Sequence, residues 1–148
     1  MENWNKIFLL FFVFFFLAVW LFVSKRLARK GGWESFSRAY PAPDSFSGQT
    51  WSFQSAVFNR GTRYNHCLEI SAGPRGVLFA AHFLVRYAHP PFFVPWSDLS
   101  GTETKSFWRR WVKLEFARLK PVSCQVPLKL ADRLEAASGG MWRYRRMV

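Results

Sequence analysis

The side chains that could carry nucleophilic or metal chemistry are two cysteines, Cys67 and Cys124, and three histidines, His66, His82 and His89. A catalytic thiol needs a neighbouring base, and a metal site needs several ligands at short, regular spacing. Neither cysteine lies in a Cys-x-x-Cys motif. His66 does precede Cys67, but neighbouring residues of an extended strand point to opposite faces of a sheet. The sequence therefore predicts structural roles for these residues and no metal site.

Motifs for phosphate binding and for acid–base or serine chemistry are also missing. The turn-like segment "GPRG" at 73–76 lacks the Lys-Ser/Thr and the helix that follow in a phosphate-binding loop, and no serine lies in Gly-x-Ser-x-Gly. The chain has nine acidic residues. Glu2 lies before the N-terminal apolar run, and no two of the eight carboxylates after that run form a motif. Asp98 is the most suggestive acid, but in "PWSDL" it is typical of a turn or cap residue. We expect a protein without a cofactor that is not an enzyme.

The first structural element is an apolar run of 17 residues, Ile7 to Val23, which contains no charged residue, glycine or proline. As a helix it would reach ~25 Å, slightly less than a hydrocarbon core of ~30 Å. A signal peptide has a shorter apolar stretch and small residues at its cleavage site, whereas "SKRLARK" follows here. A buried core helix is the other alternative, but the chain offers it no comparable apolar partner. We expect a retained transmembrane helix over 7–23, preceded by a short flank over 1–6.

Charges on either side of this run predict its orientation. Lys25, Arg26, Arg29 and Lys30 follow the run, and only Lys6 precedes it. Basic residues close to a span favour the cytoplasmic side of the membrane. The sequence therefore predicts a single-pass protein of the cell (inner) membrane, with its N-terminus outside and its C-terminal domain in the cytoplasm. We expect the four basic residues after the run to lie at the membrane interface, against anionic lipid.

Residues 24–50 are expected to be a basic juxtamembrane segment and a linker that leads the chain away from the bilayer. Within them "WESFSRAY" predicts two helical turns with Trp33, Phe36 and Tyr40 on one face. The prolines that follow cannot continue a helix.

Residues 51–140 are expected to form one mainly-β domain. Period-two alternation is clearest over 64–72, which predicts a strand with one wet face. The stretch 107–119 also fits helical spacing, but the alternation over 111–117 favours a strand. An amphipathic helix is predicted over 128–140, with good helix formers and a glycine stop. Further strands are predicted over 51–58, 77–85, 92–96 and 121–127.

These elements predict a membrane helix, about six antiparallel strands and a C-terminal helix. A curved sheet of this size leaves an open end that one helix can cap, which is the layout of the pleckstrin-homology-like (PH-like) superfold. The phrases "HPPFFVPWSDL", "VKLEF" and "VPLKLADRLEAAS" resemble a group of small membrane-anchored bacterial proteins with a PH-like, bacterial PH/GRAM-type cytoplasmic domain. The resemblance covers about 33–140 and implies no catalytic residues. The polar segment "SDLSGTETK" is expected to be a loop.

Strand alternation and the apolar face of the last helix together predict the core. These positions share an apolar side chain on the face expected to point inwards. The predicted core residues are Trp51, Phe53, Leu68, Ile70, Phe79, Phe83, Val94, Leu114, Phe116, Leu130 and Leu134.

Basic residues outnumber acidic ones by 21 to 9, which gives a net charge of +12. A basic domain tethered beside an anionic leaflet is attracted to it. The same charge would suit nucleic acid, which we do not expect as a partner. The simplest alternative is a solvated positive surface that has no specific partner. The partners expected are the lipid bilayer, an integral membrane protein and anionic lipid.

Two binding hypotheses follow for the domain. In the first it is an accessory or scaffold subunit that binds another protein through its sheet edge or its helix. In the second it is a sensor of anionic lipid headgroups, which Arg60, Arg63, Arg109 and Arg110 would hold. An exposed patch of Trp and Phe would favour the first hypothesis. A pocket ringed by three or more basic side chains would favour the second.

The tail over 141–148, "MWRYRRMV", interleaves Arg143, Arg145 and Arg146 with Trp142 and Tyr144. Cations that pair with phosphate and rings that favour the interface suit a headgroup surface. A frayed basic terminus is the alternative. The sequence thus predicts a second, electrostatic contact of the tail with the inner leaflet or with an acidic partner.

Overall fold

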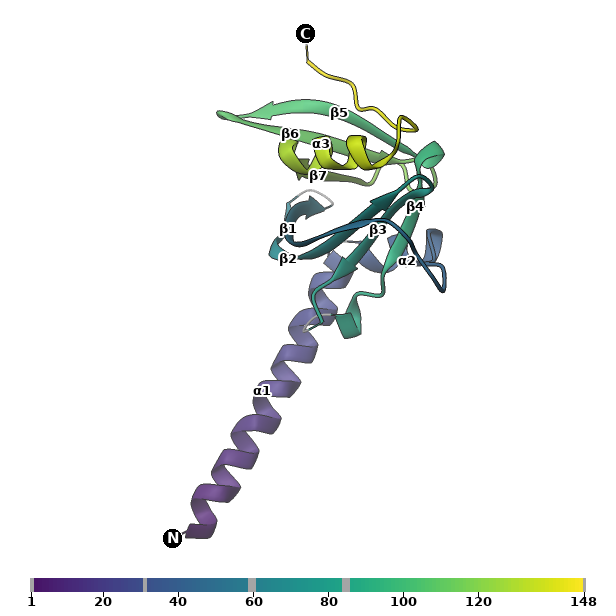
Figure 1. Cartoon of the computed structure of the whole chain (residues 1–148). Coiled ribbons are helices and arrows are strands. Elements are labelled where there is room, and N and C mark those ends of the chain that lie inside the picture. Colours follow the sequence, from purple (N-terminus) through teal and green to yellow (C-terminus); the bar gives the residue numbers. More distant parts are fainter. Residues whose placement is uncertain (1, 31, 59–60, 84–85, 148) are drawn as a thin grey trace.

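The computed structural model describes residues 2–30, 32–58, 61–83 and 86–147, with the side chains of Leu27, Arg29 and Lys30 outside this description. Helix α1, Glu2–Lys30, extends alone from the rest of the chain (Figure 1). It is long and apolar enough to cross a membrane, and its side chains from Ile7 to Val23 are exposed. Its last turns are different, because Ser24 and Ala28 are buried. The helix therefore enters the domain directly, where a linker was predicted.

Helix α2, Trp33–Ala39, follows after a sharp turn at Gly32, whose φ of 76° lies in the left-handed region that glycine adopts readily. The short helix predicted here is confirmed. The sequence predicted that Trp33, Phe36 and Tyr40 share one face. All three are also fully buried in the core of the domain. The core of the domain therefore includes residues that precede residue 51, from Ala28 onwards.

The described residues of the domain form a single antiparallel sheet of seven strands in the order β4-β3-β2-β1-β7-β6-β5. The sheet curls into a half-barrel, and helix α3, Leu128–Ala137, packs against it (Figure 1). This confirms the predicted curved antiparallel sheet with a C-terminal helix, with seven strands in place of six. The strands are β1, Gln49–Phe58; β2, Thr62–Gly73; β3, Gly76–Ala81; β4, Phe92–Pro95; β5, Leu99–Ser106; β6, Arg109–Phe116; and β7, Ser123–Pro127.

The seventh strand is β5, which the sequence predicted to be a polar loop. Its inward-facing residues are Leu99, Gly101 and Glu103, so only one of three inward positions is a large apolar side chain. Gly101 is required by close packing, because a Cβ there would lie 2.8 Å from the ring of Trp142. Strand β6 pairs with β5 along its whole length, which confirms the strand prediction over the ambiguous stretch.

Most of the predicted core is confirmed. The confirmed core residues share nearly complete burial, and they are Leu68, Ile70, Phe79, Val94, Leu114, Phe116, Leu130 and Leu134. Trp51 is partly buried and packs against this cluster.

Two core predictions are wrong, because Phe53 and Phe83 are 67% and 68% exposed. Phe53 lies at an irregularity where β1 has one more residue than β2 between two paired positions, and its φ is 56°. Such a bulge shifts the alternation of a strand by one residue. Ala56 and Phe58 are consequently the buried residues further along β1. Phe83 lies two residues beyond the end of β3 at Ala81.

Candidate binding surfaces

The most exposed aromatic side chains of the domain lie at the tip of the β5–β6 hairpin. Phe107 is 88% exposed and Trp108 is 85% exposed, and their ring centroids are 6.1 Å apart. Phe107 has a φ of 57°, a backbone conformation that turns the chain tightly between the two strands. Figure 1 shows this hairpin extending beyond the rest of the sheet, in the part of the domain away from α1.

A depression of about 400 Å³ lies beside this tip, lined by Phe107, Trp108, Trp111, Arg63 and Arg109. The fold therefore brings together two of the four arginines proposed for headgroup binding, from β2 and β6. Among the described residues these are the two cationic side chains that line the depression.

The other two predicted arginines do not join this group. The Arg110 guanidinium lies on the other face of β6, 3.6 Å from the carboxylate of Glu103, because successive residues of a strand point to opposite faces. Arg60 lies outside the described residues.

A larger groove, of about 910 Å³, runs between α3, the β5–β6 hairpin and the C-terminal tail. Its carboxylates have partners within the chain. Asp132 accepts a hydrogen bond from the Tyr144 hydroxyl, and Glu135 accepts one from Arg146 at 2.9 Å. Glu103, besides its ion pair, accepts a hydrogen bond from the backbone of Met147. The carboxylates that line the groove therefore hold the C-terminal tail against α3 and β5.

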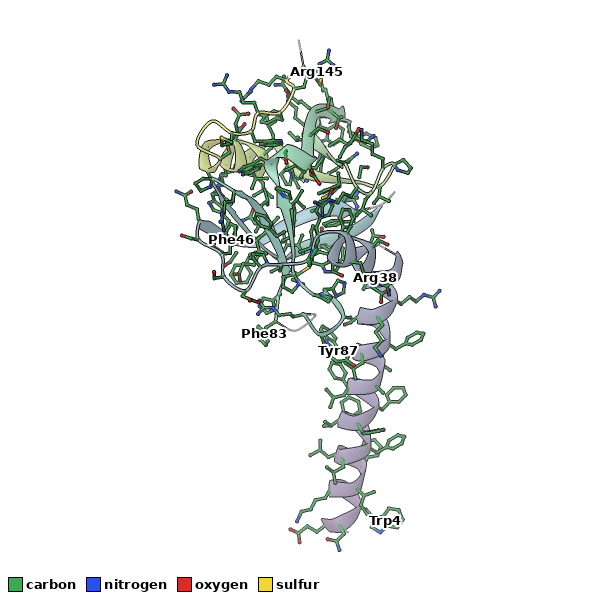
Figure 2. All side chains as sticks on the ribbon, turned by 90° about the vertical axis from the view of Figure 1, so that its right-hand side faces the viewer. Trp4, Arg38, Phe46, Phe83, Tyr87 and Arg145 are labelled. Carbon is green, nitrogen blue, oxygen red and sulfur yellow. The ribbon has the colours of Figure 1, made fainter. Side chains whose placement is uncertain are left out.

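The tail that lines this groove does not present its aromatic rings outwards, as the predicted headgroup contact requires. Trp142 and Tyr144 are buried, so their rings cannot rest among headgroups. The tail backbone pairs with β5, since Arg145 donates to Gly101 and accepts from Glu103, both at 2.8 Å. The tail lies at the end of the domain opposite to α1, as the positions of Arg145 and Trp4 in Figure 2 show.

The tail keeps a basic outer surface despite this packing. The side chains of Arg143, Arg145 and Arg146 are exposed. Burial of the Tyr144 ring, together with its hydrogen bond to Asp132, raises the pKa of Tyr144 to about 12. The phenol therefore stays protonated at neutral pH and keeps donating to Asp132, which holds the tail on α3.

Of the cysteines and histidines, Cys124 and His89 are buried, Cys67 and His82 are partly buried, and His66 is exposed. The Tyr64 hydroxyl lies 3.0 Å from Nε2 of His89, and both residues are buried. Burial raises the pKa of the Cys67 thiol and that of the Cys124 thiol, so both stay protonated near neutral pH. Within residues 2–30, 32–58, 61–83 and 86–147, no group of three acidic, histidine or cysteine side chains could hold a metal ion.

Asp98 lies in the short helix η2, Trp96–Asp98, before β5. Its carboxylate forms an ion pair with Arg118 at 3.0 Å, and its carbonyl accepts a hydrogen bond from the backbone of Ala117. The backbone N–H of Arg118 also donates to the Tyr40 hydroxyl at 3.0 Å. These contacts tie the turn before β5 to the β6–β7 connection and to α2.

The basic residues predicted at the membrane interface lie where α1 meets the domain. Lys25 and Arg26 are exposed, and the Lys25 ammonium lies 5.7 Å from the ring centroid of Tyr87. The side chains of Arg29 and Lys30 are outside the described part of the chain.

Comparison with protein-family models, with curated proteins and with solved structures finds no match for the chain. Its class is therefore defined by its architecture. One apolar helix, long enough to span a membrane, continues into a curled antiparallel half-barrel that a C-terminal helix caps.

Proposed function

We propose that this protein is a membrane-anchored, non-enzymatic binding protein that holds a partner protein at the face of the membrane. The observation that carries the proposal is the exposure of Phe107 and Trp108, 88% and 85%, at the tip of one hairpin. Single exposed apolar residues are ordinary, but a contiguous apolar patch marks an interaction site. The tip adds Arg63 and Arg109, and aromatic residues with arginine are the composition of the energetic centres of interfaces.

Position and charge favour a particular kind of partner. A domain carried by α1 can meet only partners at or near the same membrane, where the tether raises their effective concentration. The net charge of +12 favours an acidic partner surface. The row of exposed phenylalanine side chains on α1 is suited to packing against the helices of an integral membrane protein.

A sensor of anionic lipid headgroups is the second candidate. Two basic side chains, Arg63 and Arg109, line the depression, which is fewer than the three that would favour this function. The likeness of the curled sheet to the PH-like layout is its main support. The position of the depression argues against it, because the β5–β6 hairpin lies away from α1 (Figure 1). We also propose, from the sequence resemblance, that the domain belongs to the bacterial PH/GRAM-type group.

The partner hypothesis predicts the effect of removing both tip rings. Replacing Phe107 and Trp108 with serine should weaken capture of the partner by about a thousandfold, since two interface anchors each contribute about 2 kcal/mol. The measurement is recovery of partner proteins with the tagged full-length chain in mild detergent, quantified against the unaltered chain.

The matched control is Met141→Ser, which also removes an exposed apolar side chain, 68% exposed, elsewhere on the domain. It should leave recovery unchanged. Equal recovery with the double serine variant would show that the tip is not the docking site. In the lipid alternative, Arg63→Gln with Arg109→Gln should instead abolish binding to vesicles that contain anionic lipid.

We also propose that the domain lies on the cytoplasmic side, because Lys25, Arg26, Arg29 and Lys30 follow the apolar run. A reporter enzyme that is active only outside the cytoplasm, fused after Val148, should give no activity. Neutral residues at the four basic positions should weaken this preference. Strong reporter activity with the unaltered sequence would mean that the orientation is inverted.

A further inference from the structure

Three exposed aromatic side chains lie on the end of the domain that faces α1, far from the hairpin tip. Phe53, Phe83 and Tyr87 are 67%, 68% and 69% exposed. They come from β1, from the segment after β3 and from the short helix η1, Arg86–Ala88. Figure 2 shows Phe83 and Tyr87 at the edge of the domain nearest to α1. Phe53 belongs with them, because its ring and that of Phe83 both lie against His82, with centroids 6.3 Å and 4.4 Å away.

Helix α1 fixes how far this surface lies from the apolar run. The helix is continuous through its apolar residues into the domain, where Ser24 and Ala28 are buried and the helix packs against α2 and η1. The ammonium of Lys25 lies 5.7 Å from the ring centroid of Tyr87. Along the axis of α1, Tyr87 therefore lies close to Lys25, two residues after the end of the apolar run at Val23.

The length of the apolar run places this level in the headgroup layer. Seventeen residues reach ~25 Å as a helix, about 5 Å less than a typical hydrocarbon core. A span that is too short draws its flanking residues into the interface, or thins the bilayer around them. In both cases the flank at Lys25 reaches the headgroups, and no linker separates it from the domain.

We propose that Phe53, Phe83 and Tyr87, with Arg86 among them, form a second membrane contact, which seats the domain on the leaflet where α1 ends. Aromatic rings favour this layer because one part of it is apolar and the other wet. The contact gives the domain one orientation on the membrane, in which these three rings face the lipid and the β5–β6 hairpin points away from it. This surface is separate from the hairpin tip, so its test does not depend on the proposed partner.

The chemistry of the surface indicates that it needs no anionic lipid. The hollow between Phe53 and Phe83, about 190 Å³, is lined by Arg86 and by Glu69, whose charges offset each other. Lys25 and Arg26 at the end of α1 add positive charge beside this surface, but the rings supply an attraction that does not need it. Contact should occur on zwitterionic lipid and persist at high salt, unlike an electrostatic contact.

The experiment places one full-length chain in each nanodisc of phosphatidylcholine, which removes partner proteins and second copies. A nitroxide label is attached at Arg86→Cys or, as a matched exposed basic site near the hairpin tip, at Lys105→Cys. Cys67 is replaced with serine, and Cys124 is kept because it is fully buried. The readout is the ratio of collisions with oxygen, which concentrates in lipid, to collisions with a water-soluble nickel chelate.

The ratio should be several-fold higher at position 86 than at position 105, and unchanged at high salt. Phe83→Asp should lower the ratio at position 86 several-fold, because a charge replaces an exposed ring, whereas Trp108→Asp should leave it unchanged. Equal ratios at the two labelled positions would overturn the proposal. Insensitivity of the ratio at position 86 to Phe83→Asp would also overturn it, because Phe83 would then not contact lipid.

Discussion

Replacing Trp33 with alanine should lower the free energy of unfolding by about 3–5 kcal/mol, the range for truncating a large buried aromatic side chain. Trp33 is fully buried in the middle of a cluster of rings. Its ring centroid lies 5.0 Å from that of Phe92 and 5.5 Å from those of Phe58 and Tyr64. Its indole N–H donates to the carbonyl of Pro90 at 2.7 Å, which holds the segment before β4 against α2.

Unfolding of the full-length chain, with Cys67 replaced by serine, can be followed through the thiol of Cys124. This thiol is fully buried, so it becomes reactive only when the domain opens. The denaturant concentration at which it reacts should fall strongly in the Trp33→Ala variant. The matched control, Trp108→Ala, removes an equal ring that is 85% exposed and should change the stability by less than about 0.5 kcal/mol.

Trp33→Phe separates the two contributions of this residue. It keeps an aromatic ring in the cluster but leaves the Pro90 carbonyl without its donor, which should cost about 1–3 kcal/mol. If Trp33→Ala and Trp108→Ala had the same stability, α2 would not be part of the cooperative domain.

Leu134→Ala should lower the free energy of unfolding by about 2–5 kcal/mol. Leu134 is fully buried together with Leu130 and Ala131, on the face of α3 that packs against β2, β6 and β7. Loss of the side chain leaves a cavity that a rigid sheet cannot fill. The same Cys124 reactivity measures the effect, and here it reports on a strand against which α3 packs, because Cys124 belongs to β7.

Lys129→Ala is the control for this prediction, because Lys129 is exposed on the same helix and alanine is a good helix former. It should leave the stability nearly unchanged. A Leu134→Ala variant as stable as the control would mean that α3 is peripheral to the half-barrel and does not cap its core.

Local periodicity was sufficient for the elements whose buried face is apolar throughout. The alternation over 64–72 lies within β2, that over 111–117 matches β6, and the face of α3 holds Leu130 and Leu134 as predicted. Periodicity failed where tertiary packing puts other residues inside. Strand β5 buries Gly101 and Glu103, because the tail occupies the space that large apolar side chains fill elsewhere.

The binding surfaces were the least predictable part. The sequence placed Phe53 and Phe83 in the core, yet a bulge and the end of a strand turn both outwards. Trp142 was assigned to the membrane interface but packs on Gly101 in the domain. The tip residues Phe107 and Trp108 offered one usable signal, since they fall outside the alternation that begins at Trp111.

The sequence by itself determined the apolar helix, the curved antiparallel sheet and the C-terminal helix, because length, hydrophobic period and glycine or proline breaks are local properties of the chain. Only the tertiary structure decided which aromatic residues lie inside. With a fifth of all residues aromatic, rings are too common to indicate burial on their own. Whether a ring is buried depends on bulges, register and the segment that packs across it. These are set by contacts between residues far apart in the sequence, as between Trp33 and Pro90.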